Sequence, residues 1–250
     1  MAKWVINLTW EDAPHLSEED KKTLLESYAP NERDARSKGL PALGTGAIYP
    51  IPESDIVVRP FEIPKEWPRA YGMDVGWKKT AALWGAYNEQ EDTWYLYSEY
   101  YRGYAEPSVH ADAIKQRGPW IAGVIDPAAR GRGQKDGLSL LDEYSKLGLE
   151  LSLANNSVEP GILECYQRLS TGRCKIFSTL QHFLAEYRIY RREEKKSGEI
   201  KVVKSHDHLM DTFRYLIMTG MDVMQPYPMD EDDDVSDTIY STGRSEVCGY

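Results

Sequence analysis

The sequence has few cysteines and no long apolar segment. Its three cysteines are odd in number and show no C-x-x-C spacing, which argues against a disulfide framework or a thiolate zinc site. The longest apolar stretches, at residues 81–86 and 121–125, are far shorter than the roughly 20 residues needed to span a bilayer. The N-terminus carries no apolar core or cleavage signal of the kind that directs export. We therefore expect a soluble protein that acts inside a cell.

Basic residues are fewer than acidic ones: 30 lysines and arginines stand against 40 aspartates and glutamates, so the net charge of the 250 residues is −10. Seven acids and one base lie in residues 226–250, so six of the ten net negative charges fall there. We expect this segment to be a disordered acidic tail. Bases gather instead in residues 130–135 and 188–204. An acidic total does not exclude binding to nucleic acid when positive charge is concentrated on one face.

Prolines and glycines interrupt the first 68 residues. A helix is predicted from Glu18 to Tyr28, with Ser17 as its N-cap and acids in its first turn. Between Gly39 and Pro68, proline and glycine recur so often that only short extended pieces fit between them. We interpret residues 1–68 as a connector that packs against the domain after it or against something missing upstream.

Strand-sized runs begin at residue 69. Three consecutive strands, at 70–75, 80–87 and 93–101, predict an antiparallel meander. Helices then alternate with strands; the helices are predicted at 107–116, 138–147, 161–169, 180–192 and 206–224, and the strands at 120–125, 149–153, 174–177 and 199–203. The pattern predicts one α/β domain over residues 69–225. Its mixed sheet would be ribonuclease H-like, with three antiparallel leading strands, then parallel strands, flanked by helices.

Aspartates lie at the ends of several predicted elements. Asp74 lies in the first strand, Asp126 follows the strand at 121–125, and Asp211 lies one helical turn beyond Asp207 on the last helix. A carboxylate at a buried strand end needs neutralising, and a divalent cation does this effectively. Hard oxygen ligands suit Mg²⁺ or Mn²⁺. Two such ions about 3.5–4 Å apart activate a water and stabilise the leaving oxygen of a phosphodiester.

Each of these acids also has an ordinary explanation. Asp126 followed by Pro127 is a common strand-to-turn signal, and Asp207 could simply cap the last helix. Asp74 is harder to explain in this way, because aspartate is depleted in strands and this one has apolar neighbours. The combination of three acids favours a metal site more strongly than any one of them.

The residues around these acids resemble a known family. The strings Y-G-M-D-V-G at 71–76, I-D-P-A at 125–128 and H-D-H-L-M-D-T-F-R-Y at 206–215 look like the nuclease domain of large terminase subunits from tailed double-stranded-DNA bacteriophages. Upstream, T-W-E-D-A-P-H-L at 9–16 and E-R-D-A-R at 32–36 are similar to the end of that family's ATPase motor and its linker. The resemblance covers residues 4 to 220.

The resemblance implies an Mg²⁺- or Mn²⁺-dependent endonuclease that cuts concatemeric viral DNA during genome packaging, in the cytoplasm of an infected bacterium. It implies Asp74, Asp126 and Asp211 as catalytic metal ligands, with Asp207 and His208 near enough to assist a second ion. Which of Asp207 and Asp211 is the principal third ligand stays open. Double-stranded DNA would be the partner of this domain, and the portal and small terminase subunit would be partners of the full-length protein.

A complete motor of this family needs a phosphate-binding G-x-x-x-x-G-K-[ST] loop. The sequence contains no Gly-Lys dipeptide. We therefore expect a C-terminal fragment with an added start methionine, which has no ATPase activity and cannot translocate DNA by itself.

Two basic segments contain the candidate DNA contacts. A glycine-rich loop follows Asp126, where a phosphate backbone would have to approach, and glycines permit a close approach. A hairpin edge within residues 188–204 could grip DNA, and phosphate contacts there would make binding strongly salt-dependent. The alternatives are a solvated surface loop and lysines that protect a strand edge from mispairing. The candidates are Arg130, Arg132, Lys135, Arg191, Arg192, Lys195, Lys196 and Lys201.

Two other functions compete with a nuclease. The string D-V-G at 74–76 with Thr80 also resembles the first phosphate loop of actin-like and sugar-kinase ATPases, but that superfamily needs two copies of the fold and this chain has room for one. The other alternative is a non-catalytic ribonuclease H-like module that docks DNA or protein, with the acidic tail as its interaction arm. Such a module would bind DNA and never cleave it in Mn²⁺.

Overall fold

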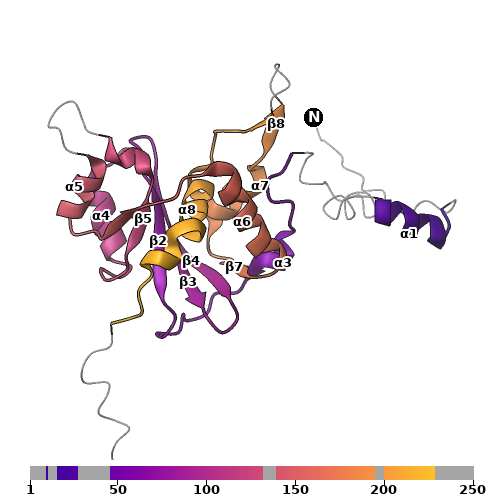
Figure 1. The fold of residues 1–250 in the computed structure, drawn as a ribbon, viewed down its shortest axis with the longest axis horizontal. Coiled ribbons are helices and arrows are strands. Elements are labelled where there is room, and N and C mark those ends of the chain that lie inside the picture. The colour runs from indigo at the N-terminus through magenta and orange to yellow at the C-terminus, as the bar shows by residue number, and fades with distance from the viewer. Residues whose placement is uncertain (1–9, 11–15, 28–45, 132–138, 195–199, 229–250) are drawn as a thin grey trace, which may run out of the picture.

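A seven-stranded mixed sheet forms the centre of the protein (Figure 1). The computed structural model describes residue 10 and residues 16–27, 46–131, 139–194 and 200–228. In sheet order, the strands are β1 (Val57–Val58), β7 (Cys174–Phe177), β4 (Thr93–Arg102), β3 (Thr80–Asn88), β2 (Arg69–Asp74), β5 (Gly123–Ile125) and β6 (Leu151–Leu153).

Strands β2, β3 and β4 form the predicted antiparallel meander. Strands β5 and β6 continue the sheet in parallel beyond β2, and β7 and β1 continue it in parallel beyond β4. Strand β3 is buried at every residue because it lies in the middle of the sheet and is covered on both faces. The predicted order of antiparallel and then parallel strands is confirmed.

Helices cover both faces of the sheet (Figure 1). On one face lie α4 (Pro107–Lys115) and α5 (Leu140–Lys146); on the other lie α6 (Val158–Ser170), α7 (Gln181–Ile189) and α8 (His208–Val223). Strand β2 alternates between the two cores, as the period of a strand requires: Tyr71 and Met73 face α4 and α5, whereas Ala70 packs with α6 to α8. Among the described residues, no helix combines the length and apolar character that crossing a membrane would require.

Helix α8 approaches β2 closely at Gly72. A Cβ atom built on Gly72 would collide with the backbone carbonyl oxygen of Thr212 on α8. A glycine is therefore required here by the packing of helix against strand rather than by the backbone angles. The close contact places the first turn of α8 next to the end of β2, where Asp74 lies.

The segment before the domain contributes to the sheet. Residues 46–68 contain α3 (Glu53–Ile56) and the edge strand β1, which pairs with β7 through Val57 and Val58. Ile48, Tyr49 and Ile56 are buried in the main core. The domain boundary at residue 68 stays a prediction, although the described part of the connector carries core residues. The acidic tail beyond residue 228 lies outside the described residues.

Near the N-terminus, α1 (Glu18–Ser27) has no buried residue. It begins where the sequence predicts, because the Ser17 hydroxyl accepts a hydrogen bond from the Asp20 backbone N–H at 3.1 Å. Asp20 in turn accepts from the Ser17 N–H at 3.3 Å. These reciprocal contacts satisfy two backbone donors at the start of the helix.

The prediction of a helix from 180 to 192 is wrong at its C-terminal end. Helix α7 stops at Ile189, and the chain then enters a small hairpin of β8 (Arg192–Glu194) and β9 (Ile200–Val202). The reason is tertiary: the Tyr190 carbonyl accepts from the Ile48 N–H at 3.0 Å, and the Arg192 N–H donates to the Gly46 carbonyl at 2.7 Å. The connector thus supplies extended partners that a continued helix would lose.

The β3–β4 turn is held by an ionic contact set around Asp92. Its carboxylate accepts from the Tyr87 hydroxyl, from Arg173 at 2.7 Å and from Arg168 at 3.1 Å. These contacts, that of Tyr87 above all, hold the pKa of Asp92 well below its usual range. A depressed folded-state pKa stabilises the protein above the unfolded pKa of about 3.9, and this stabilisation is lost as the pH falls toward the folded value.

We expect Asp92→Asn to lower the free energy of unfolding at pH 7 by about 1 kcal/mol, because the side chain is 45% exposed and solvent screens its ion pairs. The difference from wild type should shrink as the pH falls below about 4, because the unfolded wild-type chain then binds a proton at Asp92 while the folded carboxylate is still ionised. Denaturant-induced unfolding at pH 7 and at pH 3 measures the difference in the free energy of unfolding between Asp92→Asn and the wild type. Asp112→Asn, which breaks a more exposed pair with Lys115, is the control. An Asp92→Asn deficit that is equal at both pH values would contradict this assignment.

Candidate active site

Asp74 and Asp126 lie at the ends of two neighbouring parallel strands. Met73 on β2 is in register with Ile125 on β5, and the Asp126 backbone N–H donates to the Met73 carbonyl at 3.2 Å. The carboxyl ends of parallel strands share one edge of a sheet, and that edge is where open α/β sheets bind ligands. The structure therefore brings together two of the acids that the sequence singles out.

Asp74 makes its closest contact with α8. His208 Nδ1, at the first residue of that helix, lies 2.7 Å from Asp74 Oδ2. Burial raises the pKa of Asp74, the contact with His208 opposes this, and the charges of Asp211 and Asp126 raise it further. The same hydrogen bond raises the pKa of His208. When His208 is protonated, it neutralises a carboxylate that is 16% exposed.

Asp211 lies in the first turn of α8 and is bound by two cations. Arg214 donates to Asp211 Oδ1 at 2.7 Å, and Lys204 donates to Asp211 Oδ2 at 3.2 Å. Burial lowers the pKa of Lys204, but the charges of Asp211 and Asp207 more than offset it, so the pKa of Lys204 is raised. The two cations Arg214 and Lys204 thus balance the negative charge of the predicted ligand Asp211.

Arg214 is almost fully buried, at 2% exposure. Besides Asp211, it donates to the Asn156 carbonyl at 2.9 Å, and Gly161 on α6 leaves room for its side chain, because a Cβ atom at Gly161 would collide with it. Sequence reasoning missed both Arg214 and the contact of Lys204 with the acids. The available signal for Arg214 was its spacing, three residues after Asp211 on a predicted helix.

Asp126 also serves as a local cap. It precedes η2 (Pro127–Arg130), and its Oδ1 accepts from the Ala128 backbone N–H at 3.0 Å. One carboxylate oxygen of Asp126 therefore has the turn-capping role that the Asp-Pro pair indicates. This contact fixes the orientation of the side chain at the end of β5.

Asp207 occupies the N-cap position of α8 but makes no side-chain capping bond. Its Oδ2 atom is buried and accepts no hydrogen bond, and its polar contact is an ion pair with Lys204 at 3.3 Å. Capping is instead supplied from α7, where Glu186 accepts from the Leu209 N–H at 2.6 Å and from the Tyr101 hydroxyl at 2.7 Å. Glu186, which no sequence pattern singles out, fixes the start of the helix that carries His208 and Asp211.

The charges of the candidate acids shift the pKa values of the same neighbouring side chains. The charges of Asp211 and Asp126 both raise the pKa of Asp74, and burial together with Asp211, Asp126 and Asp74 raises the pKa of Tyr215. No three His, Cys, Asp or Glu side chains among the described residues are arranged to hold a metal ion. Instead His208, Lys204 and Arg214 neutralise the acids. The donor chemistry nevertheless suits a hard divalent cation, because the candidate side chains are carboxylates and the buried Asp207 Oδ2 atom has an exposed lysine, Lys204, as its ion-pair partner.

The basic candidates for DNA contact differ in their surroundings. Arg130 is exposed at the end of η2, beside Asp126, and Arg191 and Lys201 are exposed near the β8–β9 hairpin. Arg192 is bound by Glu159 through two contacts of 2.6 and 2.8 Å. The remaining candidates lie outside the described residues: Arg132, Lys135, Lys195 and Lys196.

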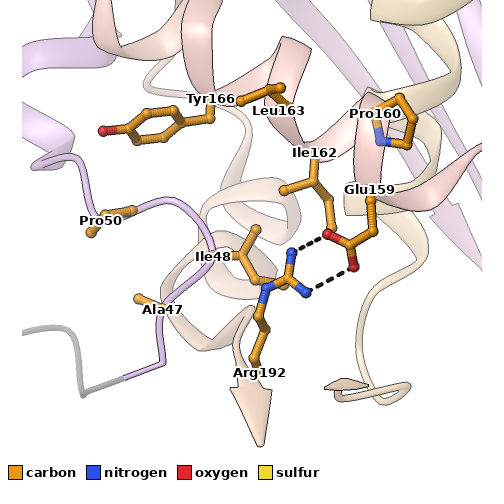
Figure 2. Close-up of a pocket in the computed structure, with 9 residues that line it drawn as sticks. All are labelled: Ala47, Ile48, Pro50, Glu159, Pro160, Ile162, Leu163, Tyr166 and Arg192. Atoms are coloured by element: carbon orange, nitrogen blue, oxygen red, sulfur yellow. Dashed lines mark hydrogen bonds and ion pairs between the residues drawn. The ribbon is translucent and has the colours of Figure 1, made fainter. Parts of the chain in front are cut away.

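The Arg192–Glu159 pair lies in a cavity of about 650 Å³ (Figure 2). Figure 2 shows connector residues such as Ile48 on one side and α6 residues such as Ile162 and Tyr166 on the other. None of the acids of the candidate site lines it. The cavity and the acids are therefore separate features.

Comparisons with known proteins agree on one family. Residues 2–56 match the family described as "Terminase large subunit, T4likevirus-type, N-terminal". The terminase large subunits of Enterobacteria phage LP7 and Salmonella phage P22 are each 32% identical to this chain, in an alignment of 222 residues that covers 84% of the chain. The match covers 45% of the LP7 protein and 43% of the P22 protein, so the chain spans less than half of either relative.

Solved structures give the same fold. The nuclease domain of the P22 large terminase superposes with a TM-score of 0.65 and 27% identity, covering 74% of this chain and 97% of that domain. The large terminase of a thermophilic bacteriophage, in complex with ADP, gives 0.62 and 22% identity over 85% of this chain and 54% of its own. The nuclease of phage G20c with bound magnesium gives 0.52 and 12%, covering 69% of this chain and 96% of its own. The predicted ribonuclease H-like fold is confirmed.

Proposed function

Because this chain belongs to the family of phage terminase large subunits, we propose that its ribonuclease H-like domain is a metal-dependent endonuclease that cuts double-stranded viral DNA during genome packaging. The observation that supports the proposal is that Asp74 and Asp126 lie at neighbouring strand ends, with Asp211 in the first turn of the helix whose His208 contacts Asp74. The site would work in the cytoplasm of an infected bacterium. In the full-length protein, the portal and the small terminase subunit would be its partners.

Asp74, Asp126 and Asp211 would hold the metal ions, and Asp207 and His208 are the candidates for further contacts. We propose Mg²⁺ or Mn²⁺; relatives with the same fold, from phage G20c, have been solved with bound cobalt and with bound magnesium. A pair of such ions supplies an activated water and stabilises the leaving oxygen of the phosphodiester.

The protein's own residues prepare the site. His208 orients the Asp74 carboxylate through the 2.7 Å contact, and the backbone of Ala128 orients Asp126. Arg214 is buried and held by Asn156, so it fixes one oxygen of Asp211. Lys204, whose side chain is 57% exposed, neutralises the other oxygen and can move aside into solvent when a stronger cation competes.

DNA would reach this edge along basic side chains. Arg130 is exposed directly after the strand end that carries Asp126, so it would meet the phosphate backbone beside the acids. Arg191 and Lys201 would add contacts from the hairpin, together with the candidates outside the described residues. Arg192 would first have to leave Glu159, and we expect it to contribute least. Such contacts carry little sequence information.

A supercoiled-plasmid assay tests the proposal. The wild-type chain should convert supercoiled plasmid to nicked and linear forms in Mg²⁺ or Mn²⁺, and EDTA should stop the reaction, because the carboxylates supply no nucleophile without a metal-activated water. Cleavage that continues in EDTA would refute the metal requirement. Binding of plasmid without cleavage in either metal would favour the non-catalytic docking module.

A further inference from the structure

Two large aromatic side chains are strongly exposed beside the candidate site. Trp77, in the β2–β3 turn, is 63% exposed, and Tyr104, after β4, is 71% exposed. Their ring centroids lie 6.3 Å apart at an interplanar angle of 86°. Exposure of this much aromatic surface is unfavourable in water, so these rings need either a partner or another explanation. We refer to Trp77 and Tyr104 as the aromatic pair.

The backbone holds the aromatic pair in place. The Tyr104 N–H donates to the Trp77 carbonyl at 2.9 Å, which ties the two turns together. Between them, Gly103 lies so close to Lys78 that a Cβ atom there would collide with the Lys78 carbonyl. Tyr104 itself has a φ of +54°, a conformation that is unusual for a residue with a side chain. The rings are thus presented by a tight, strained arrangement rather than by loose loops.

The aromatic pair lies just beyond the edge of the sheet that carries the acids. Asp74 is in register with Ala81, and Ala81 is in register with Tyr101, so the two turns extend from this same line of residues. The Tyr101 ring is 4.1 Å from the Lys79 ammonium and 6.4 Å from the His208 ring. A chain of contacts therefore runs from the turn with Trp77 to the histidine that binds Asp74. Lys78 adds an exposed positive charge in the same turn.

We propose that the aromatic pair is a stacking site for the base of an unpaired or frayed DNA nucleotide next to the phosphate to be cut. An exposed ring gives a base a flat apolar surface, and Lys78 lies where the adjoining phosphate would need a cation. This inference rests on the proposed nuclease function, because it gives the substrate of that same site a second point of attachment.

An unpaired base is the ligand class that this arrangement fits. Within an intact duplex the base faces are stacked on one another, whereas at gaps, ends and frayed segments they are open to aromatic side chains. Stacking tolerates any base, because every base has a π face. The site would therefore select a DNA structure rather than a sequence.

Binding in EDTA separates this proposal from the cleavage reaction. Fluorescence anisotropy would compare the affinity of the chain for three labelled DNA probes: a single strand, a duplex with a short internal gap and a fully paired duplex whose terminal base pairs are covalently cross-linked. Trp77→Ala should weaken binding to the first two by about 5- to 150-fold, the range for loss of one stacked base. The intact duplex should change much less. Trp77→Phe should restore most of the affinity, and Tyr166→Ala removes an exposed aromatic on α6 as the control.

The outcomes distinguish the two proposals. Unchanged affinity of Trp77→Ala for the gapped and single-stranded probes would overturn the stacking site, even if the wild-type chain nicks plasmid. An equal loss on all three probes would also overturn it, because the contact would then not depend on an open base. Selective loss without any plasmid cleavage by the wild type would support the stacking site and refute the nuclease. A melting temperature that matches the wild type confirms that Trp77→Ala remains folded.

Discussion

Replacing Asp74 with asparagine should abolish metal-dependent nicking while leaving the melting temperature nearly unchanged. Asp74 ends strand β2 and contacts His208, and the charges of Asp126 and Asp211 act on it, so its carboxylate would contribute to both ions of a pair. Loss of a residue that only supports a metal ligand costs about 10–100-fold in activity or affinity. A direct ligand should cost more, and we expect a decrease greater than about 100-fold.

The fold should tolerate this change for a physical reason. Burial raises the pKa of Asp74, which means that the folded environment disfavours its charge. Asparagine has nearly the same volume, carries no charge and can still hydrogen-bond His208. Asp222→Asn is the matched control, since Asp222 is an exposed residue at the opposite end of α8. Nicking by Asp74→Asn at the wild-type rate would remove Asp74 from the mechanism.

Gly72→Ala should produce the largest loss of stability. The added methyl group would meet the Thr212 carbonyl, which is helix backbone and cannot rotate away as a side chain can. Overpacking of this kind costs about 1–3 kcal/mol, and the rigid obstacle places this variant at the upper end. At about 2–4 °C per kcal/mol for a domain of this size, the melting temperature should fall by about 6–12 °C.

Gly72→Ala should also reduce nicking at temperatures where it remains folded. To make room for the methyl group, α8 must move away from β2, and the movement separates His208 and Asp211 from Asp74. Circular dichroism would establish the folded fraction, and plasmid nicking at a temperature below the transition would be corrected for it. Wild-type stability together with wild-type nicking would show that the helix and strand are not packed as described.

Much of the sheet could be predicted from the sequence because its signals are local. The strands β2, β3 and β4 are aromatic or β-branched runs bounded by turn residues, and they lie within two residues of the predicted positions. Strand β1 could not be predicted in this way. With only two residues, it exists because β7 offers an edge, which no local pattern encodes. The predicted end of α7 is wrong for the same reason, since partners from the connector decide it.

The candidate site, too, could be predicted only in part from the sequence. Asp74 could be found because an aspartate within an apolar strand is unusual, and Asp126 because it directly follows an apolar strand in the sequence. The partners of Asp211 and the cap of α8 could not, because Lys204 and Glu186 reach them through folding rather than through helical spacing. The assignment of ligands to metal ions stays a prediction. The sequence indicates which acids are candidates, and the structure adds which cations lie beside them.

The connector's short edge strand has a mechanical consequence. Tension applied to the chain upstream of residue 46 would meet the backbone bonds of Gly46 and Ile48 first. It would then meet the buried bond from the Tyr187 hydroxyl to the Ile51 carbonyl at 2.9 Å, and it would reach the sheet through the pairing of Val57 and Val58 with β7. Because β1 is parallel to β7, force along the strand shears these contacts together rather than peeling them one at a time. A two-residue strand can therefore act as a handle that transmits load into the rigid sheet.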